Sequence, residues 1–393
     1  MGKWQEVEIG EIVEKTNTEN PKSSPDFEFS YIDISSIDRE QTKIVEPKLL
    51  FGSEAPSRAR KKVIPGDILF ATTRPNLKNI AIVEDNSTKQ IASTGFCVLR
   101  GNKTLIENRF LFNFLLTEEV QEQIEPLIRG AQYPAISDRD LKSVKIPLPP
   151  LPEQQRIVTK LDGLFAKIDQ AIGLLEENIK HTQALMGSVL DEEFGKLDCE
   201  WFKLEDVSKI VGGGTPKTAI SEYWADEVVW LSPVDLPPIG VISKVSDSGK
   251  KISKLGLQKS SAKLLPIGTV VFSSRASIGK IAITECELAT NQGFTNFIPN
   301  EGVNNIYLAK TLKHYTPNIE ALSNSTTFKE VSKTSLKTFK IPLPQIEIQL
   351  ELSKKFSAYQ KVIDSISLIQ TQKLNHLKAL KSSLLDQAFK GEL

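Results

Sequence analysis

The sequence has few of the residues from which reactive or metal-binding sites are usually built. Only three cysteines and three histidines occur among its 393 residues. Cys97, Cys199 and Cys286 lie far apart and form no C-x-x-C pair, so neither a zinc site nor a disulfide framework is expected. Such thiols are typical of a reducing compartment, and we expect a cytoplasmic protein.

Long hydrophobic runs are missing as well. No stretch reaches the length of a transmembrane helix, and Met1-Gly-Lys-Trp-Gln-Glu6 contains no apolar signal segment, so we expect no membrane association. With 40% hydrophobic and 25% charged residues, the chain is long enough for two or three globular domains with ordinary cores.

Catalytic motifs are also scarce. Gly212-Gly-Gly-Thr-Pro-Lys-Thr218 departs from the phosphate-binding pattern G-x-x-x-x-G-K-[ST], because Pro216 stands where a glycine is required. No G-x-G-x-x-G follows a predicted strand, and neither G-x-S-x-G nor the Asp/Asn-Pro-Pro-aromatic segment of adenine methyltransferases is present. His181 and His376 occupy equivalent positions of a repeat and are more typical of inherited polar positions than of a metal or pH site. We expect no catalytic residue and no metal site.

The chain has no excess of charge of one sign. Its 49 lysines and arginines balance its 49 aspartates and glutamates. A protein that binds nucleic acid alone is usually basic. Any such binding here therefore depends on local basic patches, or on a partner that supplies part of the positive field.

What the sequence does contain is a long repeat. Lys145-Ile-Pro-Leu-Pro149 returns as Lys340-Ile-Pro-Leu-Pro344, 195 residues later, and the offset holds without a gap as far as Phe194 and Phe389. Loops tolerate insertions, so an ungapped repeat indicates a rigid element. Apolar residues in both copies step by three and four, which predicts a long helix with a coiled-coil seam. The predicted seam residues are Ile157, Leu161, Leu164, Ile168, Leu175 and Ile179 in the first copy, and Leu352, Phe356, Tyr359, Ile363, Leu374 and Leu377 in the second.

The two predicted helices alternate with two globular segments. Short strand patterns precede each helix, and Gly66-Asp-Ile-Leu-Phe70 recurs loosely as Gly268-Thr-Val-Val-Phe272. We therefore predict two α/β (α+β) recognition domains with a pseudo-two-fold internal repeat, and two long helices that form an antiparallel coiled coil. Two unrelated amphipathic helices, each packed on its own domain, are the alternative. The predicted boundaries are 1–144 and 198–339 for the globular domains, and 145–197 and 340–393 for the helices.

Several polar segments favour nucleic acid as the ligand. Arg58-Ala-Arg-Lys-Lys62 is predicted to be a basic loop that neutralises phosphates, with a merely solvated loop as the alternative. Thr72-Thr-Arg74 and Ser273-Ser-Arg275 are interpreted as equivalent strand ends, and arginine can form two hydrogen bonds with guanine. The alternative for these arginines is a carboxylate partner at the strand end. The predicted DNA-binding residues are Arg58, Arg60, Lys61, Lys62, Thr73, Arg74, Gln132, Tyr133, Lys217, Lys251, Ser274, Arg275, Thr327 and Phe328.

Three segments are distinctive: Ile146-Pro-Leu-Pro-Pro-Leu-Pro-Glu-Gln-Gln-Arg-Ile-Val158 with its helix, Ile341-Pro-Leu-Pro344, and Ala388-Phe-Lys-Gly-Glu-Leu393. In these segments, and over nearly its full length, the chain resembles the specificity subunit of type I restriction–modification systems. The second helix departs from the first, because Gln345-Ile-Glu-Ile-Gln349 lacks the Pro-Glu-Gln-Gln segment. This departure raises the hypothesis of two unequal docking sites for partners.

The resemblance implies that each globular domain reads one half of a bipartite target in double-stranded DNA. The helices would set the gap and dock two modification subunits, which methylate adenine with S-adenosylmethionine. Restriction subunits, which use ATP and Mg, would join them for cleavage, while this chain would bind no cofactor and catalyse no reaction. A freestanding bipartite DNA-binding protein and a coiled-coil adaptor without a DNA role stay open as alternatives.

Overall fold

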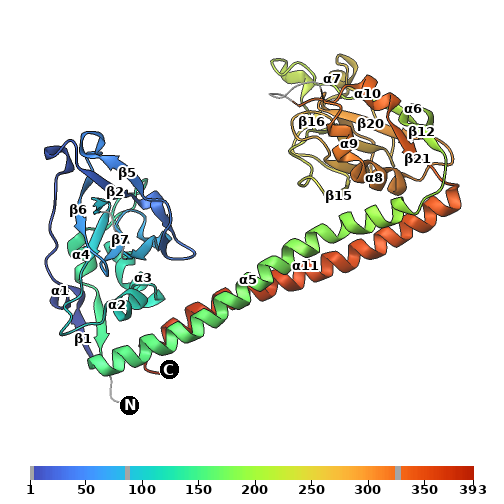
Figure 1. Ribbon diagram of the computed structural model, residues 1–393. Helices are drawn as coiled ribbons and strands as arrows, with labels where there is room; N and C mark the ends of the chain where they lie inside the picture. Colours follow the sequence, from blue (N-terminus) through green and yellow to red (C-terminus); the bar gives the residue numbers. More distant parts are fainter. Residues whose placement is uncertain (1–3, 85–88, 324–328) are drawn as a thin grey trace. The chain divides into compact units, whose positions relative to one another are not determined.

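The computed structural model of the protein describes residues 4–84, 89–323 and 329–393 (Figure 1). Its internal contacts divide the chain into two units. Unit 1 comprises Met1–Glu176 and Thr371–Leu393, whereas unit 2 is the continuous stretch Glu177–Gln370. Each unit contains one globular domain and one segment of each of two long helices.

The globular domain of unit 1 is built from short strands and short helices. One sheet has the order β5-β2-β9-β6, another has the order β10-β7-β8, and β3 pairs with β4. Strand β1 pairs antiparallel with β11, which leads directly into the first long helix. The elements are β1 (Gln5–Glu8), α1 (Ile9–Ile12), β2 (Glu28–Ile32), β3 (Ile37–Asp38), β4 (Lys43–Ile44), β5 (Lys48–Phe51), β6 (Ala59–Val63), β7 (Ile68–Ala71), β8 (Ile80–Ile82), β9 (Gln90–Ser93), β10 (Phe96–Leu99), α2 (Asn108–Leu115), α3 (Glu118–Ile124), α4 (Asp138–Lys142) and β11 (Lys145–Leu148).

The globular domain of unit 2 follows the same plan with a larger sheet. Its sheets have the orders β13-β20-β17-β18-β15 and β16-β14-β19, and β12 pairs with β21. Strands β14 and β19 run parallel, as β2 and β9 do in unit 1. The elements are β12 (Trp201–Lys203), α6 (Leu204–Val207), β13 (Ser208–Gly212), β14 (Val228–Leu231), β15 (Ile242–Val245), β16 (Lys251–Ile252), α7 (Lys254–Gln258), β17 (Val270–Ser273), β18 (Ile281–Thr284), β19 (Ala289–Thr290), β20 (Phe294–Pro299), α8 (Asn305–His314), α9 (Thr316–Glu320), α10 (Lys333–Thr338) and β21 (Lys340–Pro342).

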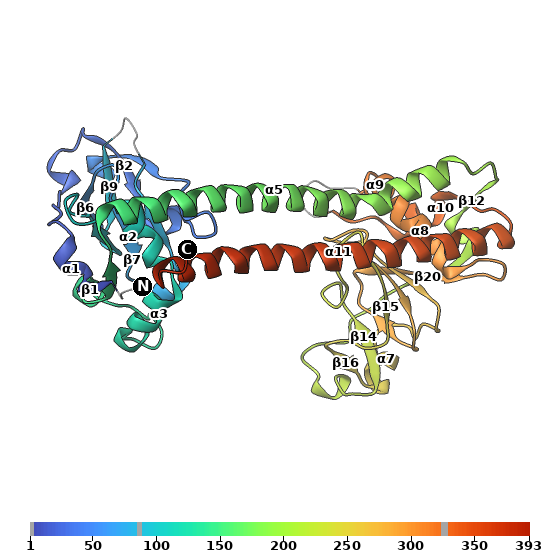
Figure 2. The ribbon, with the colours of Figure 1, turned by 90° about the horizontal axis from the view of Figure 1, so that it is seen from below.

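The long helices are α5 (Leu151–Gly195) and α11 (Ile346–Phe389), and they run side by side and antiparallel within each unit (Figure 2). In unit 1, the Nζ atom of Lys381 lies 2.8 Å from a carboxylate oxygen of Asp169. In unit 2, Lys355 Nζ lies 2.9 Å from Glu193, and Gln370 donates to Thr182 over 3.0 Å. The prediction of two long antiparallel helices is therefore confirmed in each unit.

Burial separates the predicted seam residues into three groups. Ile157, Leu161, Ile168, Leu352, Phe356 and Ile363 are all at most 7% exposed. A second group is only partly buried, namely Leu164, Leu175, Ile179, Leu374 and Leu377. Tyr359 is 41% exposed, so its assignment to the buried seam is wrong. The buried stripe passes from Phe356 to Ile363, one seven-residue repeat later, and leaves Tyr359 beside it.

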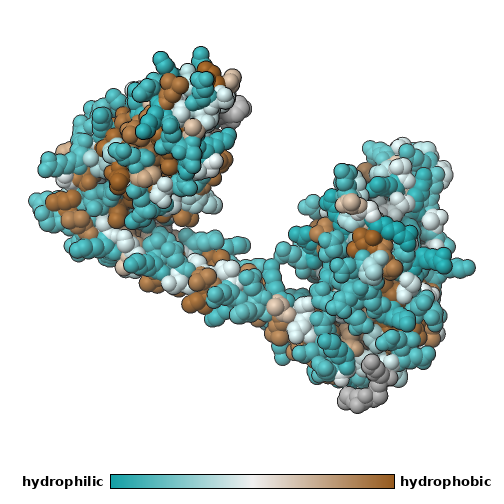
Figure 3. All heavy atoms as spheres, turned by 180° about the vertical axis from the view of Figure 1, so that it is seen from behind, coloured by the Kyte–Doolittle hydropathy of each residue, from teal (hydrophilic) through white to brown (hydrophobic). Residues whose placement is uncertain are grey.

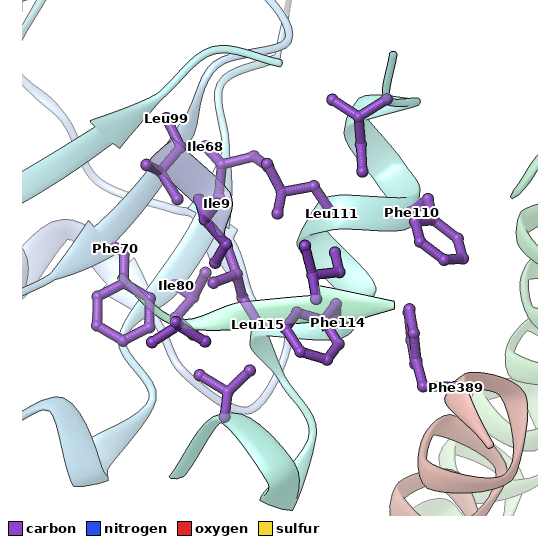
Figure 4. Close-up of a cluster of buried hydrophobic side chains, with 14 of the residues drawn as sticks. Ile9, Ile68, Phe70, Ile80, Leu99, Phe110, Leu111, Phe114, Leu115 and Phe389 are labelled. Carbon is purple, nitrogen blue, oxygen red and sulfur yellow. The ribbon is translucent and has the colours of Figure 1, made fainter. Parts of the chain in front are cut away.

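An equivalent aromatic residue near the end of each long helix packs against the globular domain of its unit. In unit 1, the ring of Phe389 lies 4.8 Å from that of Phe110 and 5.2 Å from that of Phe114, in the same buried cluster as Ile68 and Phe70 of β7 (Figure 4). In unit 2, Phe194 stacks on His314 at 4.7 Å and lies 5.9 Å from Tyr307. The helix joins the main core of the globular domain in unit 1 and forms a separate buried cluster with Tyr307 in unit 2. Such aromatic contacts contribute strongly to stability.

Candidate nucleic-acid interface

The end of strand β7 in unit 1 is held by backbone hydrogen bonds on both sides. The amide of Thr72 donates to the carbonyl of Gly95 over 2.9 Å, and the Thr72 carbonyl accepts from Ile136 over 3.0 Å. The amide of Arg74 donates to the carbonyl of Pro134 over 2.7 Å. We call this arrangement the strand-end clamp.

The same clamp forms at the end of β17 in unit 2. Ser274 donates from its amide to Gly293 over 2.8 Å and accepts from Val331 over 3.0 Å. Ala276 donates to the carbonyl of Lys329 over 3.0 Å. The bonds match one for one, so the clamp belongs to the shared frame of the two domains.

The clamp corrects the alignment of the two arginines. Strand pairing sets Ala71 opposite Phe96 and Ser273 opposite Phe294. Arg74 therefore corresponds to Ala276, and Arg275 corresponds to Thr73. The prediction that Arg74 and Arg275 are equivalent is wrong by one residue. Arg74 and Ala276 share a left-handed backbone, with φ of 51° and 57°, which is uncommon outside glycine and indicates a conformation imposed by the clamp.

The two arginines also differ in their partners. Arg275 Nε lies 2.7 Å from a carboxylate oxygen of Glu330, and both side chains are about half exposed, at 46% and 48%. This is the carboxylate partner that the sequence left as the alternative. Arg74 is exposed and forms no ion pair within the described ranges 4–84, 89–323 and 329–393. Its guanidinium is therefore the more available of the two for a ligand.

The predicted basic loop at 58–62 is a strand instead. Residues 59–63 form β6 and pair antiparallel with β9, so the loop prediction is wrong. Pairing directs three of the basic side chains onto neighbours: Arg60 donates to Asn20, Lys61 Nζ lies 2.8 Å from Asp138, and Lys62 lies 4.0 Å from Glu19.

Arg58 differs from the three basic residues that follow it. It precedes β6, it is exposed, and no described residue forms an ion pair with it. Its carbonyl accepts from the amide of Thr94 over 2.8 Å, one residue before the Gly95 of the clamp. Arg58 and Arg74 are thus two available cations on loops tied to the same turn.

The loop that follows Arg129 displays polar and aromatic side chains next to the clamp. Arg129 and Ala135 exchange two backbone hydrogen bonds of 2.9 Å, which closes a tight hairpin. Gly130 has a φ of +92°, and a Cβ atom there would lie 2.8 Å from the Tyr133 carbonyl. Gln132 is exposed and Tyr133 is 72% exposed. Thr327 and Phe328, their predicted counterparts, lie outside the described residues.

The glycine stretch 212–214 in unit 2 allows close backbone packing and does not form a phosphate-binding loop. A Cβ atom on Gly213 would lie 1.7 Å from the Asn291 carbonyl, and one on Gly214 would lie 2.2 Å from the Ala262 amide. The Trp230 indole donates to the carbonyl of Gly214 over 2.9 Å. The segment is therefore fixed against two neighbouring turns, and Lys217 is exposed beyond it.

Gln292 is a candidate reader that the sequence reasoning missed. It lies in the β19–β20 turn of the clamp, its side chain is exposed, and it is hydrogen-bonded to Thr215. The repeat offered a signal, because Gln292-Gly-Phe294 aligns with Thr94-Gly-Phe96. Glutamine can bond adenine through its amide oxygen and nitrogen together.

Lys251 is held by two carboxylates. Its Nζ atom lies 2.7 Å from Asp226 and 3.3 Å from Asp247. The hydrogen bond to Asp226, followed by that to Asp247, raises the pKa of Lys251. A lysine in two ion pairs must break them before it can bind a phosphate, so it is a weaker candidate than Lys217.

Residues of the usual catalytic types are dispersed. His181 and His376 are exposed and belong to different units. Burial raises the pKa of the Cys97 thiol to about 12, which keeps it protonated at neutral pH. Among the described residues, no three His, Cys, Asp or Glu side chains come together as metal ligands, and no helix combines the length and apolarity of a membrane span.

The family to which the chain belongs follows from comparison with known proteins. The family model described as the type I restriction modification DNA specificity domain matches residues 1–178 and 196–379. The chain belongs to this family. The two matches together span both globular domains and most of both long helices, so the specificity domain occurs twice.

Individual relatives agree with that assignment. The chain is 34% identical over 182 residues to the MjaIX specificity subunit of Methanocaldococcus jannaschii, a match that covers 44% of this chain and 41% of that protein. It is 21% identical over 474 aligned positions to the HindI specificity subunit of Haemophilus influenzae, with 100% of both chains covered.

Solved structures of specificity-domain proteins show the same fold. One chain, from work on complex assembly and conformational transition of the type I R-M system, is 31% identical with a TM-score of 0.84, over 100% of this chain and 99% of that chain. An HsdS subunit from Thermoanaerobacter tengcongensis is 32% identical with a TM-score of 0.61, over 99% and 97%. The chain therefore shares its fold with both solved structures over nearly its whole length.

Proposed function

We propose that this chain is the subunit that gives a type I restriction–modification complex its DNA specificity, with each globular domain reading one half of a bipartite target. One observation carries the proposal: the two domains hold a strand end by the same backbone bonds at Thr72 and Ser274, yet present different side chains beside it. A constant frame with varied side chains suits two half-sites of different sequence.

In unit 1, Arg58 and Arg74 carry the positive charge of the reading face. Arg74 extends from the clamp and reads a base edge, where an arginine can hold guanine through two hydrogen bonds. Arg58 binds a phosphate and fixes the position of the domain on the duplex. Tyr133, 72% exposed in the neighbouring loop, adds an aromatic contact to the same face.

In unit 2, Gln292 replaces arginine as the principal reader. Thr215 and Gln292 are hydrogen-bonded, which orients the amide, and Lys217 supplies a phosphate contact. Arg275 contributes only after its bond to Glu330 is exchanged for one to DNA. Unit 2 therefore reads its half-site mainly through neutral hydrogen-bonding groups, and partner subunits supply the rest of the positive field.

The long helices present an apolar stripe that a partner protein can cover. On α11, Tyr359, Val362, Ile366 and Ile369 follow helical spacing and are 41%, 56%, 36% and 51% exposed. Figure 3 shows brown, hydrophobic side chains at the surface of the long helices as well as of the globular domains, among largely hydrophilic ones. Contiguous exposed apolar side chains are typical of interaction sites. We assign this stripe to the docking of a methyltransferase subunit.

The chemistry resides in the partners under this proposal. Two modification subunits methylate adenine with S-adenosylmethionine, and restriction subunits with ATP and Mg join them for cleavage. The chain itself selects and positions DNA in the cytoplasm, binds no cofactor, and catalyses no step. Its helices set the gap between the two half-sites.

The proposal is tested by co-expression with the methyltransferase subunit encoded beside it, followed by co-purification and methylome sequencing. We expect a stable complex and a single methylated motif of two short blocks with a fixed gap. Val362→Asp should abolish co-purification, whereas Lys354→Asp, an exposed change elsewhere on α11, should not. A chain that forms no complex and supports no methylation would overturn the proposal.

A further inference from the structure

Two buried glutamines mark the starts of the two long helices. Gln154 is 0% exposed and Gln349 is 1% exposed, although glutamine is mostly a surface residue. Gln349 stands where the repeat places Gln154, so the glutamine is retained while Pro-Glu-Gln-Gln changes to Glu-Ile-Gln-Leu around it. A buried amide that is common to both copies needs a structural reason.

The amide of Gln154 uses both of its ends in unit 1. Its Oε1 atom accepts a hydrogen bond of 2.8 Å from the backbone amide of Glu107, the residue before α2. Its Nε2 atom donates to the carbonyls of Leu105, over 3.0 Å, and of Pro149, over 2.8 Å. One side chain therefore ties the start of α5 to the segment that leads into α2.

Gln349 makes the same three bonds in unit 2. Its Oε1 atom accepts from the amide of Asn304 over 2.9 Å. Its Nε2 atom donates to Gly302 over 3.2 Å and to Pro344 over 2.8 Å. The start of α11 is thereby tied to the start of α8. Removing a buried partner would leave several backbone groups unpaired, which is costly in both units.

The first residue of α2 and the first residue of α8 link these short helices to strands β7 and β17, whose far ends form the clamps. Asn108 donates to the carbonyl of Gly66 over 2.9 Å, and Asn305 donates to that of Gly268 over 3.3 Å. Both glycines have positive φ, of 90° and 85°, and stand just before β7 and β17. An unbroken series of hydrogen bonds and covalent links thus runs from each long helix to the strand whose far end forms the clamp.

We propose that Gln154 and Gln349 are positioning residues that fix each reading strand against its long helix and thereby restrict the gap length that the complex accepts. This inference rests on the proposed function. Successive base pairs are about 3.4 Å apart, so a displacement of that size at the clamp equals one base pair of spacing. A domain held to the helix by three bonds to one buried amide resists such a displacement.

The test compares Gln154→Leu with Gln155→Leu, each in the full chain assembled with its methyltransferase subunits. The first change removes all three bonds at similar volume, whereas Gln155 is exposed on the same helical turn and serves as the matched control. Plasmids carrying the target with gaps one base pair shorter and longer report the spacing. We expect discrimination against the altered gaps to fall about ten-fold in Gln154→Leu, as when one buried hydrogen-bonded group is lost, and to stay unchanged in Gln155→Leu.

Gap discrimination separates a positioning role from a merely structural one. A general loss of stability lowers methylation at every gap by the same factor, and that result in an assembled complex would overturn the inference. If Gln154→Leu does not assemble, Gln154→Asn keeps the polar groups on a shorter side chain, and unchanged discrimination there overturns it equally. Failure of the wild-type complex to methylate any bipartite motif would instead count against the proposed function.

Discussion

Units 1 and 2 share their frame but not the side chains that the frame displays. The clamp, the buried glutamine and the aromatic ring of the long helix recur in both. In unit 1, Arg74 is available at the clamp, whereas in unit 2 Arg275 is bound to Glu330. Backbone bonds keep the geometry independent of the exposed residues, so the reading face can change its sequence without changing its shape.

The contacts between globular domain and long helix differ in polarity between the units. Phe110 and Phe114 meet Phe389 in an apolar contact in unit 1. In unit 2, α8 brings Lys310, 5% exposed, and His314 to the helices. The contact between α8 and the long helices thus includes ionisable groups, at a cost that depends on pH.

The largest effect is expected from removing the aromatic ring that each unit takes from a long helix. Phe389→Ala should lower the stability of unit 1, and Phe194→Ala that of unit 2, by about 3–5 kcal/mol each, because a large buried ring is lost. Hydrogen exchange resolved by residue, together with urea denaturation, measures both. Leu380→Ala and Leu185→Ala, at helix positions that are 46% and 42% exposed, are the controls. Equal loss of protection in both units after one substitution would contradict the division into two units.

The second effect tests the unequal arginines. Arg74→Ala should relax recognition at one half-site by about 1–3 kcal/mol, the range for a lost bidentate base contact. Arg275→Ala should change recognition by less, because the ion pair with Glu330 already competes for its guanidinium. Methylation of targets with single base changes measures both, and Arg109→Ala, on α2 and 56% exposed, is the control. Equal losses at both half-sites from either arginine would refute the assignment.

The third effect concerns Lys310 and pH. Burial, followed by the charge of nearby Lys313, lowers the pKa of Lys310 to about 8, and the carboxylate of Asp364 opposes this shift. The unfolded chain therefore binds more protons than the folded one between about pH 8 and the usual value of 10.5, so stability rises with pH through that window. Lys310→Met should raise the stability of unit 2 by about 1–3 kcal/mol at pH 7, because a buried charge is removed.

The comparison of wild type with Lys310→Met across pH 7–10.5 isolates this residue from other groups that titrate there. Their difference in free energy of unfolding should shrink as the pH rises. A difference that stays constant would show that Lys310 is not the titrating group. Its bond to Gln360, 3.1 Å long, is lost in the variant at every pH and adds only a constant offset.

The smallest effect is expected from the ion pairs between the long helices. Lys355→Met should destabilise unit 2 slightly, and Lys381→Met should destabilise unit 1 by less, because exposed ion pairs contribute little. Glu193 is only 12% exposed, against 55% for Asp169, so its pair is less screened by water. Urea denaturation at low and high salt checks this ranking. The difference between the two losses of stability should become smaller in 1 M salt, because the Debye length falls to about 3 Å. A larger loss of stability in Lys381→Met than in Lys355→Met would contradict this ranking.

The helices and the repeat were predictable because their signals are local and long. Ile157, Leu161 and Ile168 keep helical spacing over several turns, and the 195-residue offset carries the same pattern to Leu352 and Phe356. A pattern sustained over that length leaves few competing structures. The family resemblance added the expected function, which the spacing of apolar residues cannot supply.

The proposed reading face was less predictable because it depends on pairing between distant segments. The basic residues 58–62 look like a solvated loop, but β6 pairs with β9 some 30 residues later, and strand formation depends on such neighbours more than on local composition. Thr72-Thr-Arg74 and Ser273-Ser-Arg275 look alike, yet the register with β10 and β20 offsets them by one. Gln292 was not predicted because an exposed glutamine in a turn has no local sequence signature. Only the alignment of its turn with Thr94-Gly-Phe96 indicated its position.

The division of the chain into a discontinuous and a continuous unit has a consequence for folding during synthesis on the ribosome. Unit 2 is continuous, but unit 1 needs residues 371–393, which emerge only after all of unit 2. Translation adds about 5–20 residues per second, so residues 1–176 are synthesised on the order of 10–40 s before the segment of α11 that completes unit 1. During that time Phe110 and Phe114 lack the ring of Phe389, and the nascent chain offers apolar surface to chaperones. A chain that ends at residue 370 therefore contains all residues of unit 2 but lacks part of unit 1.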